Sequence, residues 1–232
     1  MNNIKYTRGP YNKYNDTEQW IRLSEGCPNN CGYCYETKIC GSKPIYFPMP
    51  KIIRNKVKIM DMNLLYKPKA VGILKELANK RVNNKVVHYE LVCGIDWRNM
   101  SQEKANLLKK GRFQNIRFAW DGSFKHQMKI KDCLDMLIKA GYNSKLISCF
   151  MVCNWEIPYS ERIRQLDLLK IWKVKVNDCW FDNQISPNIK PIFWKVDEIK
   201  HFRKKCRKHN QLVTFGIDPE YKEEDIRTPY FI

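Results

Sequence analysis

The chain has 232 residues, of which 44% are hydrophobic and 28% are charged, and this size and balance are ordinary for one globular domain. No run approaches 18 consecutive apolar residues, and residues 1–6 are too polar for a signal peptide, so we expect a cytoplasmic protein without a membrane segment. In that reducing compartment the ten cysteines are not expected to form a disulfide framework.

The formal net charge of +18 comes from 42 Lys and Arg against 24 Asp and Glu. A field of this size attracts polyanions and raises their rate of encounter with the protein. The alternative is a compositional bias, since Lys, Asn, Ile and Tyr are abundant together, as they are in proteins from AT-rich genomes. The strongest basic run, residues 201–209, does not decide between the two interpretations.

Strand and helix patterns alternate along the chain. Residues 1–17 are polar and are expected to form a cover or an edge segment, and residues 18–23 alternate polar and apolar as a first strand does. Pro44, Pro48 and Pro50 exclude a regular helix between residues 40 and 51. The next five strands are predicted over residues 56–61, 85–93, 114–120, 145–153 and 173–181.

Helices are predicted after each of these five strands, over residues 68–79, 101–110, 125–140, 160–171 and 196–209. Ser101 is a candidate N-cap for the second of them, and Gly141 marks the end of the third. Residues 211–217 have the pattern of a last short strand. Strands of about six residues that alternate with longer helices are typical of βαβ units in a parallel α/β sheet.

A compact cysteine run follows the first strand directly. Cys27, Cys31 and Cys34 lie in the segment Cys-Pro-Asn-Asn-Cys-Gly-Tyr-Cys, in which Pro and Gly favour a tight loop. Thiolates are soft ligands that favour iron–sulfur clusters, zinc or copper(I). Three ligands leave one coordination position open, as catalytic metal sites do, whereas a structural zinc loop would need a fourth ligand, for which Cys40 is the near candidate.

This C-x3-C-x2-C spacing, with Tyr33 directly before the third cysteine, resembles the motif of the radical S-adenosylmethionine (SAM) enzymes. The resemblance implies that Cys27, Cys31 and Cys34 bind a [4Fe–4S] cluster whose fourth iron binds SAM, and that Tyr33 lies near the adenine. In that superfamily an electron from the cluster cleaves SAM to methionine and a 5′-deoxyadenosyl radical, which abstracts hydrogen from a substrate. The electron donor implied is a flavodoxin or ferredoxin.

The six strand–helix units match the partial (β/α)6 TIM-like barrel of the superfamily. The resemblance therefore implies a core domain over residues 18–210, an N-terminal extension over residues 1–17, and a C-terminal tail over residues 211–232 that packs on the core. A helix after the cysteine loop is usual in the family, and the prolines predict that it is short or displaced here.

In this architecture the carboxyl ends of the strands face the cofactor, so their polar residues are candidates for binding SAM. Asp61 and Asn63 stand where the family often has Gly-Gly-Glu, and either could accept a hydrogen bond from the SAM ammonium; alternatively they turn the chain out of the strand. Glu90 lies in an apolar strand and needs a partner, either a ribose or a buried arginine. Asp121 follows the fourth strand.

Asp96 and Arg98 follow the third strand, and an arginine there could bind the SAM carboxylate with its two-pronged guanidinium; an Asp–Arg pair is the structural alternative. The resemblance also implies that the backbone near Met151 and near Cys179 approaches the adenine.

We therefore predict a radical SAM enzyme with a [4Fe–4S] cluster and SAM as cofactors. The net charge favours a nucleic acid or a nucleotide as substrate, and the alternative is a peptide or protein side chain. A rival from another class is a zinc or iron–sulfur module that binds nucleic acid without catalysis. Metal content separates the two, because the enzyme would hold about four irons and four sulfides and the module about one zinc.

Overall fold

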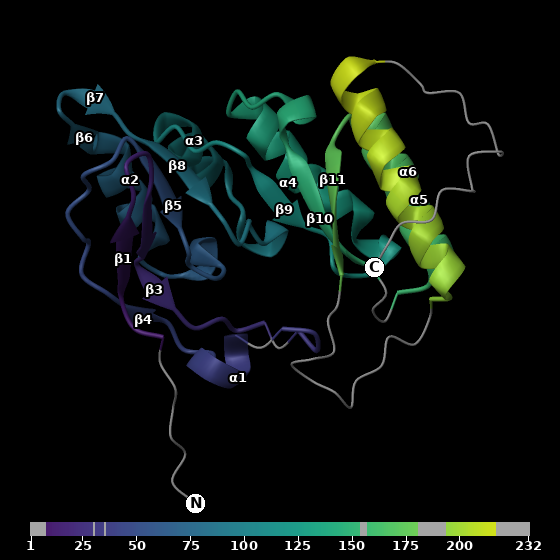
Figure 1. The fold of residues 1–232 in the computed structure, drawn as a ribbon, viewed down its shortest axis with the longest axis horizontal. Coiled ribbons are helices and arrows are strands. Elements are labelled where there is room, and N and C mark those ends of the chain that lie inside the picture. Colours follow the sequence, from purple (N-terminus) through teal and green to yellow (C-terminus); the bar gives the residue numbers. More distant parts are fainter. Residues whose placement is uncertain (1–7, 30, 35, 154–156, 181–193, 217–232) are drawn as a thin grey trace, which may run out of the picture.

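Six strand–helix units in chain order make up the core of the protein (Figure 1). The computed structural model describes residues 8–29, 31–34, 36–153, 157–180 and 194–216. The units pair β2 (Gln19–Arg22) with α1 (Glu36–Cys40), β5 (Lys56–Ile59) with α2 (Ala70–Asn79), β8 (His88–Leu91) with α3 (Gln102–Lys110), β9 (Arg117–Ala119) with α4 (Gln127–Lys139), β10 (Ser148–Cys153) with α5 (Tyr159–Ile171), and β11 (Lys175–Trp180) with α6 (Val196–Phe215).

The six strands of these units are parallel. One sheet has the order β1-β2-β5-β8, in which β1 (Tyr11–Tyr14) is an antiparallel edge strand, and a second has the order β9-β10-β11. A parallel bridge between Ile95, after β8, and Phe118 of β9 connects the two sheets. The prediction of a mixed α/β fold with parallel strands is therefore confirmed, and residues 11–14 are the predicted edge segment.

Short elements complete the described chain. Two antiparallel pairs join β3 (Ser24–Glu25) to β4 (Ile45–Tyr46) and β6 (Arg81–Val82) to β7 (Lys85–Val86). Single 3-10 turns span η1 (Leu64–Tyr66), η2 (Trp97–Asn99), η3 (Phe124–His126) and η4 (Ser144–Leu146). Ser101 caps α3 by accepting a hydrogen bond from the Lys104 amide, as its side chain predicts.

Two sequence predictions are wrong. Residues 85–93 are not one strand, because Lys85 and Val86 turn back to pair with Arg81 and Val82 before β8 begins. Of the strand predicted over residues 211–217, the described residues 211–216 are not a strand, because α6 continues to Phe215 and Gly216 ends it with a φ of 72°; residue 217 lies outside the described residues. Phe202, Cys206, His209 and Val213 are buried at helical spacing, and this stripe extends α6 past the predicted end.

The helices bury one face of the parallel sheets. Ile21, Val57 and Leu91 belong to the same apolar cluster as Leu74 of α2 and Leu108 of α3. Strand residues of opposite parity are therefore left on the other face. Figure 1 shows α6 along β11 at one edge, and α1 with the cysteine loop beyond the carboxyl ends of the strands. Among the described helices, none is long and apolar enough to cross a membrane.

Two buried charges fix the chain between β2 and the cysteine loop. The Asp61 carboxylate, 1% exposed, accepts hydrogen bonds from the Leu23 amide (2.7 Å) and the Ser24 hydroxyl (2.5 Å). The Lys67 ammonium, also 1% exposed, donates to the carbonyls of Glu25 (3.1 Å) and Gly26. Burial raises the pKa of Asp61 to about 6, although the bonds from Ser24 and Leu23 oppose the rise.

Gly26 lets the cysteine loop pass close to the chain that follows α1. It has a φ of 85°, and a Cβ at this position would lie 2.2 Å from the Lys43 carbonyl oxygen. The amide of Cys27 then donates to the Gly41 carbonyl at 3.1 Å. Gly41 also has a positive φ, 73°, but a Cβ there would meet nothing within 4 Å.

We predict that Gly26→Ala lowers the free energy of unfolding by about 3 kcal/mol or more, because left-handed strain adds to a collision with backbone. Gly41→Ala, which adds the strain alone, is the matched control and should cost about 1–2 kcal/mol. Urea unfolding of both variants measures the difference. Equal losses would contradict the close approach at Gly26.

We predict that Asp61→Asn removes a pH dependence of stability. Between the unfolded pKa and about 6 the folded protein holds a proton that the unfolded chain has released, so wild-type stability falls as pH rises through this window. The rise from 3.8 to about 6 corresponds to about 3 kcal/mol, by which the variant should gain on the wild type between pH 4 and 7. Urea unfolding at several pH values tests this, and a constant difference would refute it.

Candidate active site

A cavity of about 380 Å³ opens between the cysteine loop and the carboxyl ends of the parallel strands. All three motif cysteines line it. We call it the cysteine cavity. Of the other residues predicted to bind the cofactor, five line it as well: Tyr33, Asn63, Asp96, Arg98 and Cys179.

The cysteine loop presents free thiols to this cavity. Cys27 is buried, Cys31 and Cys34 are half-buried, and none of the three is in a disulfide. Burial raises the pKa of the Cys34 thiol, and the nearby Cys27 adds to the rise. Burial likewise raises the pKa of Cys31, which a hydrogen bond with Tyr33 opposes and Asp121 and Cys34 reinforce. The thiols of Cys31 and Cys34 are therefore protonated at neutral pH, and a metal must displace these protons to bind.

The donor set fits an iron–sulfur cluster. Among the residues that the structure describes, no three His, Cys, Asp or Glu side chains lie close enough to bind one metal ion together. A cluster makes a different demand, because each thiolate binds its own iron. Three free thiols that converge on one cavity from a single loop meet this demand.

The Asp96 carboxylate, 8% exposed, ties the cysteine loop to two strand ends. It accepts hydrogen bonds from the side-chain amides of Asn29 (2.6 Å), Asn63 (3.2 Å) and Asn99 (3.2 Å). It also accepts from the backbone amide (3.1 Å) and the Nε (2.7 Å) of Arg98. These donors saturate the acceptor sites of one carboxylate, so Asp96 orients the site and has little capacity left for a ligand.

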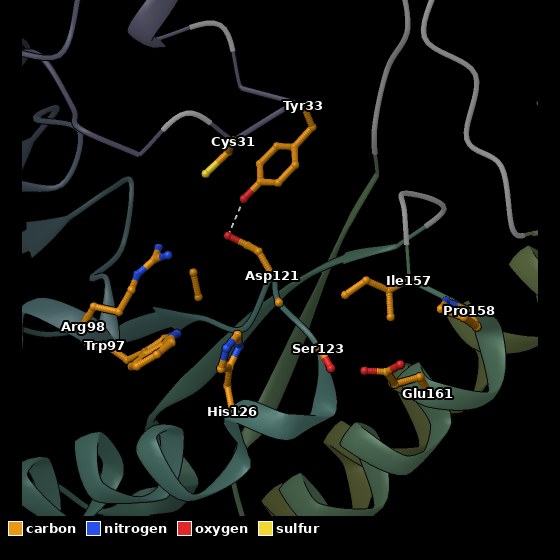
Figure 2. A pocket seen from close by; sticks show the side chains of 13 residues that line it. Cys31, Tyr33, Trp97, Arg98, Asp121, Ser123, His126, Ile157, Pro158 and Glu161 are labelled. Carbon is orange, nitrogen blue, oxygen red and sulfur yellow. Dashed lines mark hydrogen bonds between the residues drawn. The ribbon is translucent and has the colours of Figure 1, made fainter.

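Asn63 and Arg98 take their positions from this carboxylate. Asn63 has a φ of 50°, which its short side chain tolerates, and its Nδ2 also lies 3.6 Å from the Cys27 sulfur. Asp96 holds Arg98 by Nε, so the outer nitrogens of the guanidinium extend into the cavity. The predicted Asp–Arg pair is thus present, and it leaves the fork of the guanidinium directed at a ligand (Figure 2).

A second cavity, also about 380 Å³, adjoins the first. Tyr33, Arg98 and Asp121 line both cavities, and Figure 2 shows them around the second one. The Tyr33 hydroxyl donates to Asp121 Oδ2. Burial, together with the charge of Asp121, raises the pKa of Tyr33, which stays neutral. Aromatic, polar and apolar side chains also line this adjoining cavity, among them Trp97, Ser123, His126, Ile157, Pro158 and Glu161.

Asp61 and Glu90 are engaged by the protein itself. Asp61 turns the chain between β5 and η1, and both its oxygens accept hydrogen bonds from Leu23 and Ser24, as described above. Glu90 forms an ion pair with Arg117 and accepts from Asn115 Nδ2 at 3.0 Å. Neither carboxylate lines a described cavity. For both, the structure contains the structural partner that the sequence left as an alternative to a ligand.

The remaining two predicted residues, Met151 of β10 and Cys179 of β11, differ in whether they line the cysteine cavity. Met151 is fully buried, and its neighbour Val152 lines the cysteine cavity instead. Val152 is paired with Cys179 of β11, which also lines the cavity. Successive residues of a strand face opposite sides, so the Met151 side chain lies on the other side of β10 from that of Val152. The prediction concerned the backbone near Met151 and Cys179, and its approach to the adenine stays a prediction.

Sequence reasoning missed three residues that shape the site. Asn29 lies inside the motif, but its role depends on Asp96, which is 67 positions away. Lys67 donates hydrogen bonds to backbone carbonyl oxygens, and because every residue has such an oxygen, the sequence does not indicate these partners. Cys93 lines the cysteine cavity as an exposed free thiol. Asp121, recognised only as a strand-end carboxylate, lies between the two cavities.

Comparison with solved structures identifies proteins of similar fold. The radical S-adenosylmethionine methyltransferase TsrM from Kitasatospora setae, with cobalamin and a [4Fe–4S] cluster bound, has a TM-score of 0.57 and 11% identity over 69% of this chain and 36% of that one. Its structure with tryptophan substrate and the SAM analogue aza-SAM has a TM-score of 0.56 and 11% identity over 70% and 35%. Coproporphyrinogen III oxidase (HemN) from Escherichia coli, a radical SAM enzyme, has a TM-score of 0.47 and 11% identity over 72% of this chain and 44% of that one.

No family model and no curated protein matches the sequence. The chain spans about a third of the length of TsrM, and 11% identity is a likeness of fold alone. The chain therefore shares its fold with part of a radical SAM enzyme, which is the fold class that the cysteine motif predicts.

Proposed function

We propose that this protein is a radical SAM enzyme built on an incomplete (β/α)6 barrel, and that it binds a [4Fe–4S] cluster through Cys27, Cys31 and Cys34. One observation carries the proposal: the C-x3-C-x2-C loop follows β2 and directs three free thiols into a cavity at the carboxyl ends of parallel strands. When bound, the cluster would supply the electron that cleaves SAM to methionine and a 5′-deoxyadenosyl radical.

The residues of the cysteine cavity would hold the methionyl end of SAM. The outer nitrogens of Arg98 suit a carboxylate, which a guanidinium binds with two parallel hydrogen bonds. The SAM ammonium needs an acceptor. Asn63 Nδ2 lies 3.6 Å from the Cys27 sulfur, and among the described residues its Oδ1 accepts only one long contact, 3.4 Å from Asn99 Nδ2. Asp61 was the other candidate, but its burial and its two hydrogen bonds favour Asn63.

The adjoining cavity would hold the adenosine. Asp121 is an acceptor suited to ribose hydroxyls, and Tyr33, which lies beside it, lines both cavities. Trp97 and His126, with ring centroids 5.5 Å apart, add flat surfaces. Burial and neighbouring lysines lower the pKa of His126, so its ring is neutral at pH 7. A neutral ring can pack on a base without adding charge to the cavity.

For the substrate, we propose a nucleic acid or a nucleotide, supported by the net charge of +18. A peptide or protein side chain is the alternative. The electron would come from a flavodoxin or a ferredoxin. The division into an extension over residues 1–17, a core over 18–210 and a tail over 211–232 is part of this proposal, although α6 crosses residue 210.

We predict that anaerobic reconstitution loads about four irons and four sulfides per chain, and that Cys27→Ala, Cys31→Ala or Cys34→Ala each lowers the iron content severely. Cys93→Ala, which removes a thiol from the same cavity, is the matched control and should load fully. Iron and sulfide analysis with the visible absorption spectrum measures loading. A full cluster in Cys31→Ala, or one zinc and no iron in the wild type, would contradict the assignment.

We predict that Arg98→Ala weakens SAM binding about tenfold or more, because a hydrogen bond to a charged group contributes about 1.5–3 kcal/mol. Cluster loading should persist, since Arg98 binds no iron in this proposal. Equilibrium dialysis with labelled SAM measures the affinity, and Arg81→Ala, at an exposed arginine of β6, is the control. Unchanged affinity in Arg98→Ala would remove Arg98 from the SAM site.

A further inference from the structure

The face of the sheet β1-β2-β5-β8 that points away from α2 and α3 carries a set of basic and aromatic side chains. The strand register places them together, because Tyr11 pairs with Arg22, Lys13 with Trp20, Trp20 with Lys58, and Lys58 with Glu90. We call this surface the open face. Its members lie on four adjacent strands: Tyr11, Lys13, Trp20, Arg22, Lys56, Lys58, His88 and Glu90.

The open face is accessible and positively charged. Lys13 and Lys56 are exposed, and the other six members are half-buried, in contrast to Ile21, Val57 and Tyr89 on the covered face, each at most 1% exposed. Four cations lie on it against one carboxylate, Glu90, whose charge the neighbouring Arg117 already offsets. Glu18 at the rim pairs with Lys58 at 2.8 Å. The surface therefore retains a positive balance.

Cations and rings alternate on this face. Arg22 lies 5.7 Å and Lys13 lies 5.6 Å from the centroid of the Tyr11 ring, and Lys58 lies 5.6 Å from that of Trp20. The chain thus has two aromatic rings within a field of cations. Single-stranded nucleic acids are bound by such surfaces, in which cations follow the phosphates and rings stack on bases.

The open face leads to the cysteine cavity. Arg22 is the last residue of β2 and is followed by the chain that leads to Cys27. On the other sheet, Arg117 lies 5.5 Å from the ring of Phe150, which lines the cavity. A chain bound along the face would therefore reach the site of the proposed chemistry.

We propose that the open face binds a single-stranded nucleic acid and guides it toward the cysteine cavity. This inference rests on the proposed function, whose nucleic-acid substrate it places on the protein. Charge complementarity favours a polyanion, and the interleaved rings favour exposed bases over a duplex or an anionic lipid surface, which offer no unstacked base.

The test measures binding of a fluorescein-labelled single-stranded RNA of about 12 nucleotides and mixed sequence by fluorescence anisotropy, at several salt concentrations. Lys13→Glu/Lys56→Glu should weaken binding about tenfold or more and make it less dependent on salt by about one phosphate contact for each lysine. Lys110→Glu/Lys139→Glu changes the net charge equally at exposed positions of α3 and α4 and should change affinity little. Tyr11→Ala, which keeps every charge, should weaken binding about fivefold or more.

Three results would overturn the inference. Equal losses in the two double variants would mean that net charge alone drives binding, and preference for a duplex of the same sequence would contradict stacking. Absence of any RNA binding would refute this face and the nucleic-acid substrate together. Cluster loading and SAM binding are measured separately, so the radical SAM assignment would survive such a failure. Circular dichroism of each variant verifies folding.

Discussion

The Asp96 carboxylate is the contact on which the arrangement of the site depends. Asn29 of the cysteine loop and Asn63 at the end of β5 donate hydrogen bonds to this carboxylate. Arg98, in the turn after β8, donates to it as well. Hydrogen bonds to a charged group are stronger than those between neutral groups, so this carboxylate can hold the cysteine loop and the two strand ends in place. The same carboxylate directs Arg98 into the cavity, and thereby links the position of the thiols to that of the proposed SAM carboxylate.

A second set of buried charges prepares the approach to the loop. Asp61 holds the amide of Leu23, and Lys67 holds the carbonyls of Glu25 and Gly26, so the chain between β2 and Cys27 is fixed from both sides. Burial lowers the pKa of Lys67 while Asp61 opposes that change, and each charge thus supports the other. Stability of this segment is therefore tied to the protonation of Asp61.

Local patterns predicted the strand–helix order and the three cysteines as candidate ligands, because periodicity, helix caps and ligand spacing depend on residues that are close in sequence. Ser101 and Gly141 mark helix ends as expected. Long-range partners could not be predicted in this way: Asn29 acts through Asp96, and Glu90 through Arg117. The strand predicted at residues 211–217 failed because the buried stripe of α6 extends one turn further than propensity suggests.

The central claim is that the cysteine cavity is a site of reductive SAM cleavage. The most direct measurement is 5′-deoxyadenosine formation from SAM by the anaerobically reconstituted protein under a strong reductant. The account predicts that the product forms and that it disappears in Cys27→Ala. A fully loaded [4Fe–4S] protein that binds SAM but yields no 5′-deoxyadenosine, with or without single-stranded RNA, would contradict it.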